Sequence, residues 1–139
     1  MMRIYPGIDL VNLARLQQVM ARHPAFLEDV FTDQERAFCL ARAHPGRHLA
    51  GRFAVKEASL KALGVGLSTT GLDRVLRDIE LLPAASGQPQ LILHGWAKHL
   101  SRKKHIIQNA VSISHSADFA IAIVVLTGMD RARLPNEVP

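Results

Sequence analysis

Apolar and polar residues follow two different spacings along the chain, and these spacings predict a mixture of strands and helices. The segment 4–11 is rich in strand formers but is interrupted by a proline-glycine pair, so a short strand is expected to begin near Gly7. Asn12 then has the character of an N-cap. Apolar residues at helical spacing over 13–20 predict an amphipathic helix that ends before Pro24.

Two further helices are predicted downstream. Thr32 followed by Glu35 has the form of a capping box, which opens a helix through about Ala43. A third and longer helix is expected over about 47–63, and Gly64 supplies the left-handed residue that follows its end.

The middle of the chain carries weaker signals. The loop after the third helix is expected to be flexible and to extend through Gly71. The segment 72–82 suits either a helix or a strand, and a strand is favoured over its second half. Turn residues over 86–89 precede a predicted strand at 91–93.

A short helix and a hairpin are expected to complete the fold. The helix is predicted over about 96–103, with Ala97 and Leu100 facing inward. Strands are predicted at 110–114 and 120–126, and the short link between them indicates an antiparallel hairpin.

The composition is that of one globular domain. The chain has 139 residues and is 48% apolar, which is enough to bury a core. We expect a domain over 1–127 and a flexible tail over 128–139. No apolar run approaches the ~20 residues that cross a bilayer and no signal peptide is evident, so we expect a cytoplasmic protein without a membrane partner. The lone cysteine, Cys39, is expected to be buried and reduced.

The charge balance favours an anionic partner. Seventeen Lys and Arg against twelve Asp and Glu leave a net charge of +5, which suits a nucleic acid, a nucleotide cofactor or an acidic protein. A basic nucleic-acid-binding module is one alternative, and the basic run 102–105 is its strongest support. That alternative gives no reason for two carboxylates that lie on apolar elements.

The first of these carboxylates is Glu57 in the long helix. Phe53, Ala54 and Leu60 lie one turn away, so its side chain is expected to project from a mainly apolar face. A buried unpaired carboxylate is costly, and either Lys61 at i+4 or a metal ion is expected to satisfy it.

The second is Asp9, which lies between Ile8 and Leu10 in a predicted strand where aspartate is disfavoured. It either caps the following helix or marks the end of the strand, or it binds a metal. A hard cation such as Mg²⁺ takes one or two protein carboxylates and fills its other positions with phosphate and water. Arg52, Lys56 and Lys61 lie near Glu57 in the sequence and would suit phosphate oxygens, although such a run is also typical of a solvated helix face.

Three segments in this order and spacing resemble the holo-[acyl-carrier-protein] synthases, the small trimeric type of 4'-phosphopantetheinyl transferase. They are GIDL at 7–10, GRFAVKEASLKALG at 51–64 and SISH at 112–115, and the similarity covers 7–126. The resemblance implies an α+β fold with an antiparallel sheet packed around a long helix, assembled as a homotrimer with active sites between subunits. It departs at Asn12, where relatives are often acidic, and in the loop 64–73.

The resemblance also implies a reaction. A serine of apo acyl carrier protein attacks the β-phosphate of coenzyme A, receives 4'-phosphopantetheine and releases adenosine 3',5'-bisphosphate, by default in fatty-acid and lipid synthesis. Either a carboxylate or a metal-bound water would take the serine proton. A protein of the same fold that binds coenzyme A without modifying a carrier is a second alternative.

Residue roles follow from the resemblance in the same way. Asp9 and Glu57 would hold Mg²⁺, and Lys61 would contact the phosphates or help to deprotonate the serine. Arg52, Lys56 and His115 would bind the anionic groups of the cofactor, and Arg15 and Arg22 would bind the acidic recognition helix of the carrier. For His115 the alternative is a hairpin histidine bonded to the backbone, and for the two arginines it is solubility. The two arginines are seven positions apart, which places both on one helix face.

Overall fold

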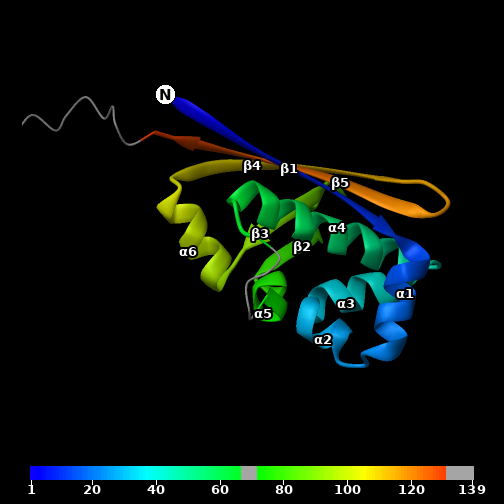
Figure 1. The fold of residues 1–139 in the computed structure, drawn as a ribbon. Helices are drawn as coiled ribbons and strands as arrows, with labels where there is room; N and C mark the ends of the chain where they lie inside the picture. Colours follow the sequence, from blue (N-terminus) through cyan, green and yellow to red (C-terminus); the bar gives the residue numbers. More distant parts are fainter. Residues whose placement is uncertain (67–71, 131–139) are drawn as a thin grey trace, which may run out of the picture.

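The chain folds as a three-stranded antiparallel sheet lying along one long helix, with the remaining helices on the same side of the sheet (Figure 1). The computed structural model describes residues 1–66 and 72–130, and of 72–74 only the backbone. The α+β class expected from the sequence is confirmed.

The sheet has the strand order β1-β5-β4, with β1 at Met2–Asn12, β4 at Ile106–His115 and β5 at Phe119–Met129. The predicted hairpin is therefore confirmed, and its strands are longer than expected. β1 also begins earlier than expected and passes through Pro6. An edge strand tolerates proline because one side of its backbone has no ladder partner.

The long helix α4, at Pro45–Leu63, forms the centre of the core. It begins near the predicted residue with a proline in its first turn, and Gly64 closes it with φ 76°, as expected. β1 crosses α4 so closely that a Cβ on Gly7 would lie 1.8 Å from the carbonyl oxygen of Ala58. Only glycine fits at this crossing, which explains the first residue of the GIDL segment.

Three helices connect β1 to α4: α1 at Leu13–Arg22, α2 at Phe26–Val30 and α3 at Asp33–Leu40. Asn12 caps α1 by accepting a hydrogen bond from the backbone N–H of Arg15 at 2.9 Å. The capping box of α3 is present, as predicted, although the helix ends before Ala43. The five-residue α2 was not predicted, because so short a segment has no measurable periodicity.

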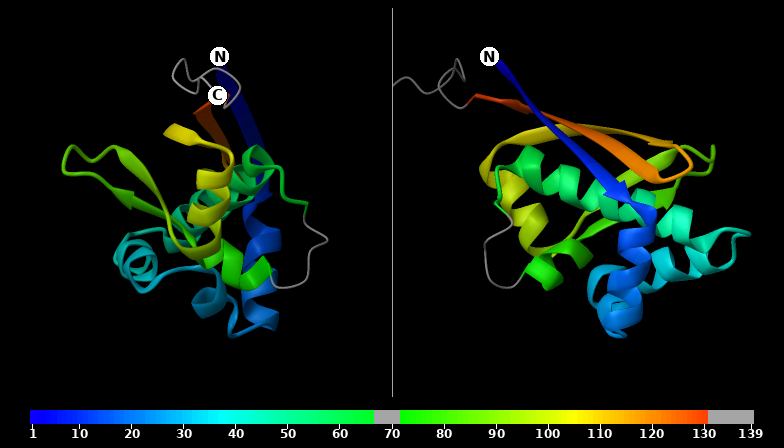
Figure 2. Two further views of the ribbon diagram at one scale, coloured as in Figure 1. Left: turned by 90° about the vertical axis from the view of Figure 1, so that its left-hand side faces the viewer. Right: turned by 45° about the vertical axis from the view of Figure 1, so that its right-hand side comes forward.

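The ambiguous segment 72–82 contains both a helix and a strand. α5 covers Leu72–Arg77, and β2 at Ile79–Pro83 pairs with β3 at Pro89–Leu93 in a separate antiparallel hairpin. This hairpin projects from the body of the molecule (Figure 2). α6 at Gly95–Lys103 follows, with Ala97 buried and Leu100 partly buried as predicted.

The ends of the expected domain are only partly described. β5 continues to Met129, past the boundary expected at 127. Most of the predicted tail (131–139) and most of the loop that was expected to be flexible (67–71) lie outside the described residues. Among the described helices, none combines the length and apolar character that a membrane crossing requires.

Candidate functional site

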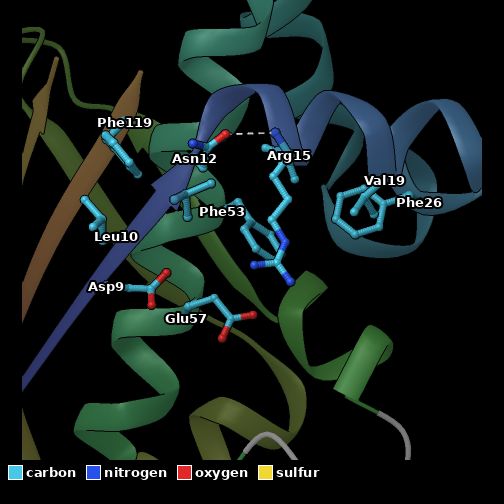
Figure 3. A pocket seen from close by; sticks show the side chains of 11 residues that line it. Asp9, Leu10, Asn12, Arg15, Val19, Phe26, Phe53, Glu57 and Phe119 are labelled. Atoms are coloured by element: carbon cyan, nitrogen blue, oxygen red, sulfur yellow. Dashed lines mark hydrogen bonds between the residues drawn. The ribbon is translucent and has the colours of Figure 1, made fainter. Parts of the chain in front are cut away.

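Asp9 and Glu57 lie together, although 48 residues separate them in the sequence. Asp9 shares with Gly7 and Val11 the face of β1 that packs on α4. Glu57 projects from the middle of α4, and the two carboxylates border one open space (Figure 3). Both line a cavity of about 410 Å³. The two residues that looked misplaced in the sequence are therefore parts of one site.

Glu57 has a buried carboxylate that lacks a direct partner among the described residues. Its residue is 9% exposed, and among the described residues no hydrogen-bond donor or cation contacts its carboxylate directly. Burial and, less strongly, the nearby charge of Asp9 raise the pKa of Glu57 to about 7, against the charge of Lys61, which lowers it. A cation bound in the cavity would stabilise the charged form of Glu57 against both burial and the repulsion from Asp9.

Lys61 pairs with Asp9 rather than with Glu57. Its Nζ donates to Asp9 Oδ1 at 3.1 Å and to the backbone carbonyl of Ile8 at 2.9 Å. The helix salt bridge from Glu57 to Lys61, one of the two alternatives for Glu57, is not formed. The side chain of Lys61 stays 49% exposed, so its ammonium lies where a ligand entering from solvent would meet it.

The donor set fits a hard divalent cation. Within the described residues no cluster of three or more His, Cys, Asp and Glu side chains is present that could hold a metal. Two carboxylates suit Mg²⁺, which keeps its remaining positions for water and phosphate. Asp9 and Glu57 offer carboxylate oxygens of this kind on one cavity wall.

The rest of the cavity is mainly apolar and is bordered by α1. The side chain of Arg15 extends from α1 toward the carboxylates (Figure 3). Arg22 lines a neighbouring cavity of about 460 Å³. Phe26 and Phe53 line both cavities, with their ring centroids 5.7 Å apart. The predicted polar face of α1 therefore lies along the rim of the site.

A second cluster, basic in character, forms around the first half of α4. The Nε2 atom of His115 lies 3.0 Å from the carbonyl oxygen of Arg47, which matches the backbone-bonded alternative for this histidine. The guanidinium groups of Arg42 and Arg52 lie 4.0 and 4.3 Å from the ring centroid of Phe38. Arg52 also donates to the carbonyl of Leu81.

His48 belongs to the same cluster. Its pKa is lowered by burial and then by the charges of Arg52, His115 and other basic neighbours. An anion bound among these side chains would oppose the effect of the positive charges and raise the pKa of His48. We refer to Arg42, Arg47, His48, Arg52 and His115 as the basic cluster.

Lys56 lies one turn after Arg52 on α4, but its ammonium is enclosed in the core. It is 0% exposed, and its Nζ donates to Glu35 Oε1 at 2.7 Å, to the carbonyl of Leu76 at 2.9 Å and to the carbonyl of Ile79. Burial lowers its pKa, and the charge of Glu35 opposes that effect. The geometry gives Lys56 no access to a cofactor, in contrast to the role that the resemblance implied.

Several residues of these clusters were not singled out from the sequence. Arg42, Arg47 and His48 come from a segment without a motif, and only the fold groups them: His115 contacts the Arg47 carbonyl, and Arg42, Arg47 and His115 all lie close enough to His48 to affect its pKa. Glu35 was identified as part of a capping box, and its second partner, Lys56, is 21 residues away. No local pattern could have shown that contact.

Comparison with known proteins gives a consistent result. A family model described as the 4'-phosphopantetheinyl transferase superfamily matches residues 5–124. The holo-[acyl-carrier-protein] synthase of Moorella thermoacetica is 42% identical over 120 residues, which cover 86% of this chain and 91% of the relative.

Two solved structures share the fold and carry a nucleotide ligand by their description. The acyl-carrier-protein synthase of Chronobacterium ammoniagenes in complex with coenzyme A has a TM-score of 0.81 and 31% identity, and the match covers 92% of this chain and 99% of that one. The Bacillus anthracis holo-(acyl-carrier-protein) synthase, in complex with CoA (3',5'-ADP), has a TM-score of 0.72 and 33% identity, with 93% and 100% covered.

Proposed function

Since the chain belongs to the 4'-phosphopantetheinyl transferase superfamily, among its holo-[acyl-carrier-protein] synthases, we propose that it transfers 4'-phosphopantetheine from coenzyme A to apo acyl carrier protein. The observation that carries the proposal is the pair Asp9 and Glu57, which meet in one cavity within the two matching motifs. The reaction takes place in the cytoplasm, as the sequence led us to expect.

The chemistry is a displacement at phosphorus. The serine hydroxyl of the carrier attacks the β-phosphorus of coenzyme A, and a new oxygen-phosphorus bond forms. The bond from that phosphorus to the bridging oxygen breaks, and adenosine 3',5'-bisphosphate leaves with the bridging oxygen. The serine proton passes to a basic group of the site.

Asp9 and Glu57 hold Mg²⁺, which when bound neutralises and orients the diphosphate. Lys61 has three N–H donors, and two of them bond to Asp9 and to the Ile8 carbonyl. The third donor and the exposed position of the ammonium suit a phosphoryl oxygen. Lys61 thus orients one metal ligand and stabilises charge on the transferred group.

The basic cluster binds the other anionic groups of coenzyme A. Arg52 and His115, expected from the sequence, belong to it, and Arg42, Arg47 and His48 extend it. Lys56 is left out because all three of its donors are bonded inside the core. Arg52 lies five residues before Glu57, about 140° around the helix. Within one chain, Glu57 and the basic cluster therefore lie on different sides of α4.

This separation supports a homotrimer in which each active site combines groups from two copies. The outer face of the sheet supports it as well. Ile8 pairs with Ile123 and Leu10 with Ile121 across β1 and β5, and all four side chains are exposed in the single chain. The described helices lie on the opposite side of the sheet (Figure 2). A contiguous apolar face of this kind marks an interface.

The acidic carrier protein docks on α1. Arg15 and Arg22 lie along the rim of the two cavities, and both are exposed. Their guanidinium groups suit carboxylates of the carrier, and the net charge of +5 steers the encounter.

The first experiment measures the intact mass of apo acyl carrier protein after incubation with this protein, coenzyme A and Mg²⁺. We expect the carrier to gain the mass of one phosphopantetheine, to gain none with a chelator, and to react at least about 100-fold more slowly with Asp9→Asn. A carrier that another transferase modifies but that gains no mass here would contradict the proposed activity. It would favour a protein that binds coenzyme A without catalysis.

A further inference from the structure

Lys56 immediately precedes Glu57 in the sequence, yet its side chain points about 100° away around α4, into a different part of the core. The ammonium is 0% exposed and has three N–H donors. Three internal acceptors satisfy them: the carboxylate of Glu35 and the backbone carbonyls of Leu76 and Ile79. No donor remains for a ligand.

The three acceptors come from three different elements. Glu35 lies on α3, Leu76 in the last turn of α5, and Ile79 at the start of β2. Carbonyls in the last turn of a helix have no partner within the helix, so Leu76 needs an outside donor. Lys56 supplies that donor and ties α4 to all three elements at one point.

Glu35 extends the connection beyond the ion pair. Its Oε1 also accepts from the backbone N–H of Thr32 at 3.0 Å, and its Oε2 accepts from the backbone N–H of Leu81 at 3.2 Å. Thr32 donates through its hydroxyl to Glu80, and the other oxygen of Glu80 lies 3.0 Å from Nε2 of His94. The network therefore reaches from the centre of the core to the surface of the β2–β3 hairpin.

Directional hydrogen bonds can fix the rotation of a helix about its axis, which apolar packing alone does not determine. Where α4 meets β1 its side chains are small, namely Ala58 and Ala62 beside Gly7, and the hydrophobic effect has no preferred direction. Rotation of a helix by 10° moves the end of a side chain by roughly 1 Å. A metal site tolerates about 0.5 Å, so the rotation of α4 decides whether the Glu57 carboxylate is correctly placed beside Asp9.

We propose that Lys56 is a positioning residue of the metal site, which sets the rotation of α4 through its bonds to Glu35, Leu76 and Ile79 and thereby places Glu57 opposite Asp9. This role replaces the cofactor contact that the sequence suggested. It rests on the proposed function only in taking Asp9 and Glu57 as the metal ligands. Lys56 itself touches neither metal nor substrate.

The test removes the pair without leaving a charge in the core. Lys56→Met alone strands Glu35 in the interior, which is strongly destabilising, whereas Lys56→Met with Glu35→Gln replaces a buried pair by neutral groups of similar size. The matched control is Arg36→Met with Asp33→Asn, which removes a partly exposed ion pair on the same α3 together with the bridge from Asp33 to Arg77 on α5. Each protein is titrated with Mn²⁺ alone by calorimetry, and its thermal unfolding is recorded.

A positioning role predicts that the double variant unfolds cooperatively but binds Mn²⁺ about tenfold more weakly than wild type, as for other residues that orient metal ligands. The control should bind Mn²⁺ with wild-type affinity. A folded double variant with wild-type Mn²⁺ affinity would overturn the proposal, because a purely structural pair has no effect on the metal. That result would contradict the positioning role of Lys56 even if the transfer assay gave full activity.

A measurement on the wild-type protein covers the case in which the double variant does not fold. Coupling between two sites is reciprocal, so metal binding at Glu57 must in return stabilise the network. Saturating Mg²⁺ should slow hydrogen exchange of the Leu81 amide, which bonds to Glu35, more than exchange of the β3 amides. Equal slowing across the hairpin would contradict the proposal.

The outcomes also separate this inference from the proposed activity. Wild-type protein that binds Mn²⁺ but transfers nothing to the carrier would overturn the proposed activity. The Mn²⁺ affinity of the double variant would still decide the positioning role. Wild-type protein that binds no Mn²⁺ would overturn both.

Discussion

Lys56 and Glu57 are adjacent charged residues that burial affects in different ways. Lys56 has a full set of hydrogen-bond partners, so its charge is accommodated inside the core. Glu57 has none among the described residues, and its pKa is raised to about 7 by burial and by Asp9. The contrast distinguishes a residue that stabilises the fold from one that requires a ligand.

This contrast leads to a prediction for the metal-free protein. The ordinary pKa of a glutamate is near 4.5, and the folded value for Glu57 is about 7. The folded chain therefore binds the proton more tightly than the unfolded chain. The contribution of Glu57 favours folding fully below about pH 4.5 and is lost as the pH rises through about 7.

Glu57→Gln should remove this loss of stability. We expect the metal-free variant to be more stable than metal-free wild type at pH 8, on the order of 1 to 3 kcal/mol, because one pKa unit corresponds to about 1.4 kcal/mol. Its transferase activity should nevertheless fall at least about 100-fold. Denaturant unfolding with a chelator at pH 5 and pH 8 checks the first statement. A variant less stable than wild type at pH 8 would show that Glu57 has a stabilising partner.

At the scale of elements, the crossing of β1 over α4 places Asp9 against Glu57. The crossing depends on Gly7, where a Cβ would lie 1.8 Å from the Ala58 carbonyl oxygen. Gly7→Ala should separate the two elements, destabilise the fold by about 1–3 kcal/mol or more, and lower the activity even at temperatures where the variant is folded. Activity and thermal unfolding measured together check this expectation.

Gly46→Ala is the matched control for this substitution. Its Cβ would approach only the end of the flexible Gln17 side chain, at 3.1 Å. Stability and activity should stay close to wild type. An active, fully stable Gly7→Ala protein would mean that the crossing adapts to a side chain without displacing Asp9.

The elements also indicate how far the sequence could be interpreted. Asn12, the Thr32 to Glu35 capping box and Gly64 are local signals with their own hydrogen-bond or backbone geometry, and all three lie where they were expected. Periodicity could not separate α5 from β2, because only one residue lies between a six-residue helix and a five-residue strand.

The site shows the same division between local and distant information. Asp9 and Glu57 could be identified because a carboxylate among apolar residues is conspicuous in the sequence, whichever secondary structure the segment forms. The partners of Lys61 and Lys56 could not be predicted. Lys61 bonds to a residue 52 positions away and Lys56 to one 21 positions away, and helix spacing pointed only to neighbours on α4.

α1 leads to a prediction about the carrier protein. Arg15→Ala and Arg22→Ala should each raise the KM for acyl carrier protein by about tenfold and leave the KM for coenzyme A unchanged, because a charge pair in a partly desolvated interface is worth about 1.5–3 kcal/mol. Gln18→Ala, on the same face of α1, is the control. Steady-state kinetics with each substrate varied in turn separate the two constants. An equal rise in both would place the arginines in the cofactor site instead.

At the scale of the whole molecule, the outer sheet face is the feature that a single chain leaves unexplained. Ile4, Ile8 and Leu10 on β1 are more than half exposed, at 61%, 61% and 56%. Ile121 and Ile123 on β5 lie beside them in the sheet. In the proposed homotrimer this face is buried against other copies and each active site combines the basic cluster of one chain with the carboxylates of another, so assembly and activity are expected to depend on each other.

Ile123→Lys tests that dependence. Ile123 is 43% exposed in the single chain, so lysine should be tolerated there with little effect on the folding of one copy. Buried in a trimer interface, its unpaired charge would oppose association. We expect sedimentation to show a trimer for wild type and a monomer for Ile123→Lys, with transferase activity reduced at least about tenfold and partly restored at high protein concentration. Leu40→Lys, at an exposed apolar residue on α3, should remain trimeric and active. A wild-type monomer with full activity, or an active Ile123→Lys monomer, would mean that one chain contains the complete site and that the apolar face serves another purpose.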